Sequence, residues 1–148
     1  MKIRKATKKD LKEVIDIMLT EFSKPPFNER VNFQDALKSL RFYFKLGEIY
    51  VAVIDKKIVG IVIFKIEQYW EGKVLIIEDL AVREEFKEQE VGKKLMNFVE
   101  SYSKKKNIKR VLFITNKKSK ALGFYKRLGY KEGKNRINME KKLKWKQI

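Results

Sequence analysis

Apolar residues recur along the chain with two different periods, and each period predicts a different kind of element. Over residues 11–22 they return every three or four positions, which is the spacing of an amphipathic helix. Thr7 precedes this stretch and Asp10 follows three residues later, a capping pair that predicts where the helix begins. The same helical spacing predicts two further helices, from Asn32 to Gly47 and over residues 90–102.

Continuous apolar runs predict buried strands. Three of them, residues 48–54, 58–70 and 74–82, are separated by short turns and predict an antiparallel meander. A further run at residues 108–115 follows the helix over residues 90–102. This arrangement predicts a βαβ crossover, in which the strand before the helix and the strand after it are parallel.

The remaining elements are short. They are a strand at the start, a helix after the crossover and one or two strands near the end, over residues 1–6, 119–130 and 130–143 respectively. The resulting order, β-α-α-β-β-β-α-β-α-β, predicts an α/β (α+β) fold with a mixed central sheet. No stretch has the composition of a linker or repeats another, so we expect one domain over residues 1–148.

The chain contains neither histidine nor cysteine, and this excludes whole classes of chemistry. A Ser-His-Asp triad, imidazole or thiolate metal sites and cysteine nucleophiles are ruled out. We therefore expect no metal, and acid–base chemistry falls to Glu, Asp, Tyr, Lys, the backbone or water. The formal net charge of +17 attracts anions such as phosphates and nucleic acid.

Two features of the composition predict where the protein works. No apolar run is long enough to span a bilayer, and the N-terminal stretch "MKIRKATKKD" lacks the apolar core of a signal peptide. We therefore expect a soluble, cytoplasmic protein with no membrane partner. Charged residues make up 37% of the chain and are dominated by Lys and Glu, which suggests a thermophile.

Residues 80–96, "LAVREEFKEQEVGKKLM", pass from a buried strand into a helix through a highly charged turn. A helix N-terminus presents unpaired N–H groups and the positive end of the helix dipole, so it binds anions readily. Lys87, Lys93 and Lys94 flank the turn, and Gly92 lets a ligand approach the backbone closely. The pattern indicates a phosphate-bearing ligand, with an ordinary turn and solvated lysines as the alternative. It is neither a dinucleotide fingerprint nor a P-loop, because both need more glycines.

Residues 121–130, "ALGFYKRLGY", supply a second motif, and the two motifs together resemble the GNAT superfamily of N-acetyltransferases. In the acyl-CoA-binding signature of that family, an Arg or Gln is followed by two residues, a Gly, one residue, and a Gly or Ala. Lys87, Glu90 and Gly92 occupy these three positions. The resemblance covers essentially the whole chain, and the order of elements given above matches the GNAT fold.

Two positions depart from the family pattern. Glu90 stands where the signature has its first glycine, and Lys118 stands where many members carry Asn, with Asn116 close but out of register. A carboxylate at position 90 is expected to repel the pyrophosphate and to weaken acetyl-CoA binding modestly. Replacing Glu90 by Gly is expected to destabilise the free protein slightly, because Gly weakens helices and a favourable dipole interaction is lost.

The resemblance implies that acetyl-CoA is the acyl donor and that its pyrophosphate lies at the charged turn, held by backbone N–H groups of residues 88–93. The cofactor-binding residues that it implies are Leu80, Ala81, Val82, Lys87, Glu88, Gln89, Glu90, Val91, Gly92, Lys93, Asn116 and Tyr125. It also implies that a primary amine attacks the thioester directly in a ternary complex, without an acyl-enzyme. The acceptor (a peptide, a protein or a small amine) and a homodimeric state are left open.

The resemblance implies two catalytic side chains. Tyr125 is the acid that protonates the departing thiolate, and Glu78 is the general base, acting directly or through a water. Composition alone favours a core aromatic for Tyr125, and a strand-end salt bridge is the alternative for Glu78. Asp79 is expected to pair structurally on the opposite face of the strand, because side chains alternate along a strand. The backbone N–H near Leu80 is the expected oxyanion donor.

The acceptor groove is expected between the first two helices and the late hairpin. Two rival functions stay open. The net charge supports a nucleic-acid-associated basic binding module, although the lysines are spread through the chain without an aromatic-basic platform. The departures at Glu90 and Lys118 support a GNAT pseudoenzyme that binds acyl-CoA without transferring the acyl group.

Overall fold

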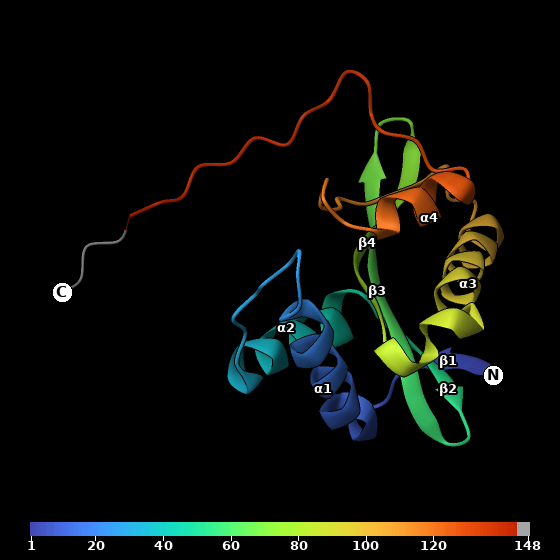
Figure 1. The fold of residues 1–148 in the computed structure, drawn as a ribbon. Helices are drawn as coiled ribbons and strands as arrows, with labels where there is room; N and C mark the ends of the chain where they lie inside the picture. Colours follow the sequence, from blue (N-terminus) through green and yellow to red (C-terminus); the bar gives the residue numbers. More distant parts are fainter. Residues whose placement is uncertain (145–148) are drawn as a thin grey trace.

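A five-stranded mixed sheet forms the centre of the computed structural model, which describes residues 1–144 (Figure 1). The strands lie side by side in chain order, and every neighbouring pair is antiparallel except the last, which is parallel. This confirms the predicted meander and crossover. The strands are β1 (Lys2–Lys5), β2 (Glu48–Ile54), β3 (Lys57–Tyr69), β4 (Gly72–Val82) and β5 (Arg110–Leu112).

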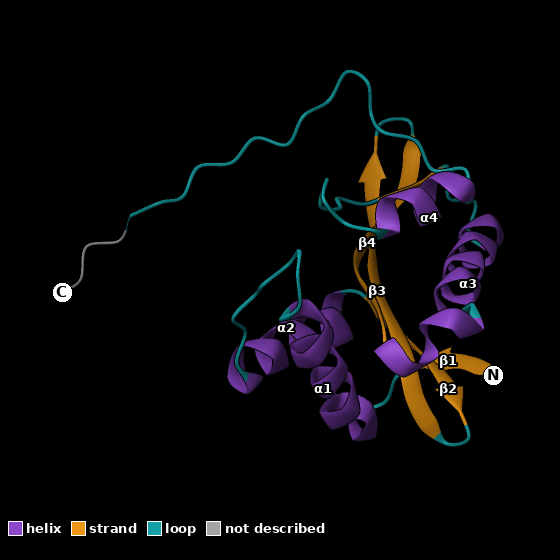
Figure 2. Ribbon diagram, viewed as in Figure 1, coloured by secondary structure: helices purple, strands orange, loops and turns teal. Residues whose placement is uncertain are grey.

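Helices cover both faces of the sheet. Figure 2 shows the first two α-helices on one side of the strands and the last two on the other. The α-helices are α1 (Leu11–Phe22), α2 (Phe33–Leu46), α3 (Val91–Lys105) and α4 (Ala121–Arg127), and two short 3-10 helices are η1 (Lys8–Asp10) and η2 (Glu84–Gln89). The three-layer α/β arrangement confirms the predicted fold class.

Each helical layer packs on the sheet through its own apolar core. On the α1–α2 side, side chains such as Ile15, Leu40 and Ile61 are completely or almost completely buried. On the α3–α4 side the corresponding residues include Phe64 and Leu95. Full burial of one such side chain contributes about 1.5–3 kcal/mol, so these two cores fix both layers of helices on the sheet.

The helix ends follow the local signals in the sequence. The Thr7 backbone N–H donates to the Asp10 carboxylate at 2.7 Å, and Arg4 donates to the same carboxylate. Hydrogen bonding to Arg4 holds the pKa of Asp10 at about 2. The Asn32 side chain accepts the Asp35 N–H at 2.9 Å at the start of α2, and Gly47 ends that helix. The capping predictions are confirmed.

Gly60 in β3 sets how closely α3 approaches the sheet. A Cβ atom at this position would lie 2.9 Å from Val91 Cγ1 and 3.1 Å from Leu95 Cδ1. The first distance is shorter than real Cβ contacts and the second is tighter than most, so any larger residue at position 60 would require Val91 and Leu95 to shift. The start of α3 is thereby held against the sheet beside the end of β4.

The end of the chain differs from the prediction. Residues 108–115 were expected to form a strand, but β5 covers only Arg110–Leu112. The prediction of strands over residues 130–143 is wrong, because residues 130–144 contain no strand and are exposed from residue 131 onward. Its apolar residues are separated by lysines and arginines, so within one chain the segment buries too little apolar surface to offset the cost of ordering it. Figure 1 shows it leaving the body of the molecule.

A β-bulge interrupts β4 where the sheet meets the site described below. Ile63 faces Asp79 and the next residue, Phe64, faces Ile77, so Glu78 is an extra residue without a partner in β3. A bulge breaks the alternation of side chains and increases the local twist. The expectation that Glu78 and Asp79 lie on opposite faces is therefore wrong. Ile63 packs in the α1–α2 core, and Glu78 and Asp79 both act electrostatically on Tyr43 of α2, on that same side.

Candidate active site

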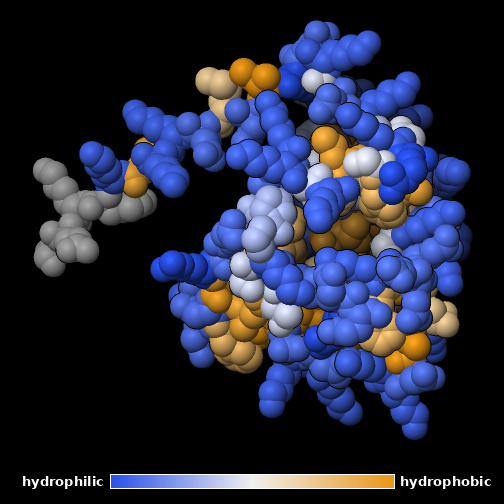
Figure 3. Space-filling model, viewed as in Figure 1, coloured by the Kyte–Doolittle hydropathy of each residue, from blue (hydrophilic) through white to orange (hydrophobic). Residues whose placement is uncertain are grey.

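One pocket of about 1000 Å³ lies between the two helical layers at the end of β4. Figure 3 shows a hollow there with apolar side chains in its depth and hydrophilic side chains around its rim. The end of α1 and the loop after it form one wall, and the first turns of α3 and α4 form the other. The lining includes Glu21, Lys24, Phe27, Leu80, Ala81, Val82, Glu84, Lys87, Glu90, Gly92, Lys93, Thr115, Ser119, Lys120, Phe124, Tyr125 and Leu128.

The pocket exists because β4 and β5 separate. Their parallel pairing covers only Val74 to Ile76 on β4, after which the chain beyond β5 diverges. From Ile77 to Val82, β4 pairs with β3 alone in the part of the chain that the structure describes. Peptide groups on the other edge of this segment have no strand partner, and an exposed strand edge binds an extended ligand through backbone hydrogen bonds.

The first turn of α3 supplies hydrogen-bond donors at the same pocket. The first intrahelical hydrogen bond runs from Lys94 N–H to Glu90 C=O, so the preceding N–H groups of the helix have no acceptor within it. Together with the positive end of the helix dipole they favour an anion. Gly92 lines the pocket, and a Cβ here would meet Phe124 at an ordinary 3.5 Å. Position 92 therefore accepts a small side chain as well as glycine.

The backbone conformation explains the family's glycine at position 90. Glu90 has φ 58° and ψ 25°, in the left-handed region, where it joins the end of η2 to the start of α3. Residues other than glycine adopt this conformation at a cost of about 1–2 kcal/mol. The sequence-based expectation placed Glu90 in ordinary helix and so predicted that glycine would destabilise the protein. Because Glu90 is left-handed, the helix-propensity argument against glycine does not apply here, and glycine is instead the residue that adopts this conformation without cost.

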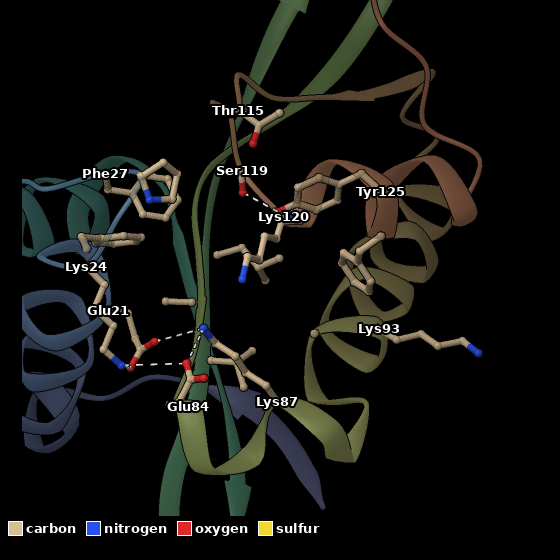
Figure 4. Close-up of a pocket in the computed structure, with 18 of the residues that line it drawn as sticks. Glu21, Lys24, Phe27, Glu84, Lys87, Lys93, Thr115, Ser119, Lys120 and Tyr125 are labelled. Carbon is tan, nitrogen blue, oxygen red and sulfur yellow. Dashed lines mark hydrogen bonds and ion pairs between the residues drawn. The ribbon is translucent and has the colours of Figure 1, made fainter. Parts of the chain in front are cut away.

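The structure brings most of the predicted cofactor-binding residues to the pocket. Those that line it are Leu80, Ala81, Val82, Lys87, Glu90, Gly92, Lys93 and Tyr125. Figure 4 shows the Lys93 side chain pointing away from the pocket and the Lys87 side chain reaching into it. Val91 is buried in the α3 core, and Glu88 and Gln89 are exposed and do not line the pocket. Asn116 is also outside it, where its side chain accepts the Lys118 N–H at 2.8 Å.

Several pocket residues had no assigned cofactor role in the sequence. Lys120, directly before α4, extends into the pocket in Figure 4, and Thr115 and Ser119 lie on the same side. Glu21 pairs across the pocket with Lys87 at 3.4 Å. With 36 basic residues in the chain, sequence alone does not tell which lysines turn inward.

Tyr125 presents the hydroxyl group in the apolar part of the site. The residue lies on α4, is half-buried, and packs against Phe113 with ring centroids 4.6 Å apart. Burial raises the pKa of Tyr125 above its usual value, so the hydroxyl stays protonated throughout the neutral range. Tyr125 can therefore donate a proton at neutral pH.

The two adjacent carboxylates on β4 have different surroundings. Glu78 forms an ion pair with Lys65 at 3.1 Å. Asp79 has no ion pair or side-chain hydrogen bond within residues 1–144. Desolvation, and after it the charges of Glu78 and Glu29, raise the pKa of Asp79 to about 6. The expectation that Asp79 is the structurally paired residue is wrong, and its pKa is suited to accepting a proton near neutral pH.

Comparison with known proteins identifies the class of enzyme. The model of the acetyltransferase (GNAT) family matches residues 11–130, which is most of the chain. The protein therefore belongs to the GNAT family and is an acyltransferase of the acetyltransferase type. Comparison with curated protein sequences gave no match.

Solved structures share the fold at low sequence identity. A possible acetyltransferase from Clostridium difficile 630 has 17% identity and a TM-score of 0.86, covering 97% of this chain and 98% of that one. A transcriptional regulator from Bacillus halodurans has 21% identity and a TM-score of 0.81, covering 94% and 98%. An aminoglycoside acetyltransferase from an uncultured soil metagenomic sample has 22% identity and a TM-score of 0.76, covering 97% and 96%.

Among residues 1–144, no three His, Cys, Asp or Glu side chains converge as a metal site requires. None of the helices in that range combines the length and the apolar character of a bilayer-crossing segment.

The backbone at position 90 gives a testable stability order. In an ordinary helix Gly is about 1 kcal/mol less stable than Ala. At a left-handed position the order is reversed, because only glycine adopts this conformation without cost. We therefore predict that Glu90→Gly unfolds in urea with a free energy about 1 kcal/mol larger than that of Glu90→Ala. Both variants lose the same carboxylate, so the comparison isolates the backbone. A Glu90→Ala variant that is the more stable of the two would show that the residue is not left-handed in solution.

Proposed function

We propose that the protein transfers an acetyl group from acetyl-CoA to a primary amine by direct attack in a ternary complex. The observation that carries the proposal is the convergence on one pocket of the unpaired β4 edge, the free N–H groups of α3 and the Tyr125 hydroxyl. Membership of the GNAT family, which generally uses acetyl-CoA, supports the same donor. The acceptor is a peptide, a protein or a small amine.

The residues around the pocket fit the parts of acetyl-CoA. The α3 N-terminus and Lys87 are suited to the pyrophosphate, because backbone N–H groups and a lysine make charge-assisted hydrogen bonds to phosphate oxygens. The edge of β4 from Leu80 to Val82 is suited to the extended pantetheine arm, which carries amide groups. Phe124 and Leu128 supply apolar contacts in the depth of the pocket. When bound, acetyl-CoA would supply an activated thioester, whose carbonyl carbon the amine would attack directly while the CoA thiolate leaves.

The protein's own groups then transfer the protons and stabilise the negative charge that develops on the thioester oxygen. We assign Asp79 as the general base in place of Glu78, because Asp79 is unpaired and its pKa is about 6 while Glu78 is held by Lys65. A backbone N–H near Leu80, on the open edge of β4, stabilises the oxyanion. Tyr125 donates its proton to the departing thiolate. Each role uses a group that is in the required protonation state at neutral pH.

Acidic residues close to Asp79 favour a cationic acceptor. Glu29, in the segment between α1 and α2, is near enough to contribute to the raised pKa of Asp79, and Glu78 adjoins it. Negative charge at this place attracts a protonated amine before it loses its proton. One structural neighbour is an aminoglycoside acetyltransferase, so a polycationic amine is one acceptor class to test. Cytoplasmic location and a thermophilic source stay predictions from the sequence, and a homodimeric state stays open.

Binding of acetyl-CoA is the first test. At a concentration of about 100 times the dissociation constant, acetyl-CoA should stabilise the folded protein by about 2.7 kcal/mol. Thermal unfolding measures this, and mass spectrometry of reactions with peptides, polyamines and aminoglycosides then identifies the acceptor. Binding without transfer to any amine would instead support the acyl-CoA-binding pseudoenzyme. A melting temperature that rises with an oligonucleotide but not with millimolar acetyl-CoA would support the nucleic-acid module, which the net charge of +17 favours.

Tyr125→Phe tests the proposed acid. The substitution keeps the ring packed against Phe113 and removes the hydroxyl group. We predict that kcat falls by about 10²–10⁴-fold, the usual contribution of a general acid, while the dissociation constant of acetyl-CoA changes little. Tyr130→Phe is the matched control, because Tyr130 packs on the same Phe113 and does not line the pocket. Equal loss of kcat in both variants would assign the effect to packing.

Asp79→Asn and Glu78→Gln separate the two carboxylates. Because the pKa of Asp79 is raised to about 6, this carboxylate is mostly ionised at pH 7 and loses its basic form as the pH falls through about 6. We predict that kcat of the parent enzyme declines below that pH, that Asp79→Asn lowers kcat and abolishes the decline, and that Glu78→Gln keeps it. The reverse result, with the acidic limb lost only in Glu78→Gln, would restore Glu78 as the base.

A further inference from the structure

Four alternating charges close one side of the pocket. Glu21 comes from the last turn of α1, Lys24 from the loop after it, and Glu84 and Lys87 from η2. The Lys87 ammonium lies 2.8 Å from a Glu84 oxygen and 3.4 Å from a Glu21 oxygen, and the Lys24 ammonium lies 3.1 Å from Glu21. Figure 4 shows Lys87 between the two carboxylates, so the cation proposed to bind the pyrophosphate is already paired.

Glu21 and Glu84 are destabilised to different degrees when Lys87 moves away from them. The Glu21 side chain is only 8% exposed, and a buried carboxylate without a cation is strongly destabilised. Lys24 stays within 3.1 Å of Glu21, so this carboxylate keeps a partner after Lys87 has gone. The Glu84 side chain is 60% exposed and can be solvated by water. Neither carboxylate therefore prevents Lys87 from moving.

The ion pairs of Lys87 with Glu84 and Glu21 nevertheless oppose its transfer to a ligand. Burial alone lowers the pKa of Lys87, but hydrogen bonding to Glu84 and the charge of Glu21 outweigh it and raise the pKa above its usual value. The pKa of Glu84 is lowered in turn by Lys87. A phosphate that recruits Lys87 has to replace these interactions.

We propose that Lys87 is a shared cation, held by Glu84 and Glu21 in the free protein and transferred to the pyrophosphate when acetyl-CoA binds. Glu84 thereby competes with the ligand for Lys87 and lowers the affinity for CoA. Lys24 reduces the free-energy cost of the transfer, because it remains paired with the buried Glu21. This proposal rests on the proposed function, because it assumes that CoA occupies this pocket. It adds that Glu84 lowers the affinity for CoA and that Lys24 keeps Glu21 paired.

Calorimetric titration with CoA itself tests the competition without turnover. Glu84→Gln should bind CoA about 1.5- to 5-fold more tightly than the control Glu85→Gln at low salt, the range that an exposed ion pair is worth. Glu85 is the matched control because it is the next residue of η2, is exposed, and has no ion pair in the described part of the chain. At about 1 M salt, where the Debye length is roughly 3 Å, the difference should disappear.

The same two substitutions made in a Lys87→Gln protein show whether Glu84 changes the affinity for CoA through Lys87. In Lys87→Gln, the Glu84→Gln and Glu85→Gln substitutions should change CoA affinity equally, because no shared cation is left. Thermal unfolding of each free variant checks that the fold is retained. Equal affinities of Glu84→Gln and Glu85→Gln in the parent background, or weaker binding by Glu84→Gln, would overturn the competition while leaving the proposed function intact. Failure of the unsubstituted protein to bind CoA at all would overturn both.

Discussion

From Ile77 to Val82, β4 is hydrogen-bonded along one edge only, and the candidate site depends on this constraint. The bulge at Glu78 adds a residue to β4 and increases its twist, and β4 parts from β5 just before it. The end of β4 is thereby left with free peptide groups next to the start of α3. Gly60 leaves room for that start to pack closely on the sheet, so the unpaired edge and the free helix N–H groups face the same pocket. The same bulge turns Glu78 and Asp79 to the α1–α2 side.

Charge acts in this protein at two different ranges. The net charge of +17 attracts any anion from a distance and is screened over roughly 8–10 Å at physiological salt. Inside the pocket the balance is different, because Glu21 and Glu84 already pair with Lys87. Long-range attraction therefore favours the encounter with a nucleotide, while local pairing limits the affinity. On the other side of β4, acidic groups around Asp79 offer a site of opposite sign within a basic protein.

The sequence predicted the helices and the meander well because their signals are local. Apolar spacing, the Thr7–Asp10 pair and the Asn32 cap act within a few residues, and the structure confirms them. The bulge at Glu78 depends on how two strands align, so simple alternation gave the wrong faces for the carboxylates. The left-handed backbone at Glu90 was visible only indirectly, as a departure from a glycine in the family signature. Which lysines face the pocket depends on contacts across the fold, such as Glu21 with Lys87.

In the proposed complex, CoA lies along the unpaired edge of β4 with its pyrophosphate at the start of α3. Titration of the ¹⁵N-labelled protein with CoA, followed by amide chemical shifts, tests it directly. We predict that the largest shifts fall within residues 77–82, on the amides that point away from β3, and on residues 91–93, because these groups gain hydrogen-bond acceptors. Large shifts confined to the basic surface elsewhere, with residues 77–82 unmoved, would contradict it.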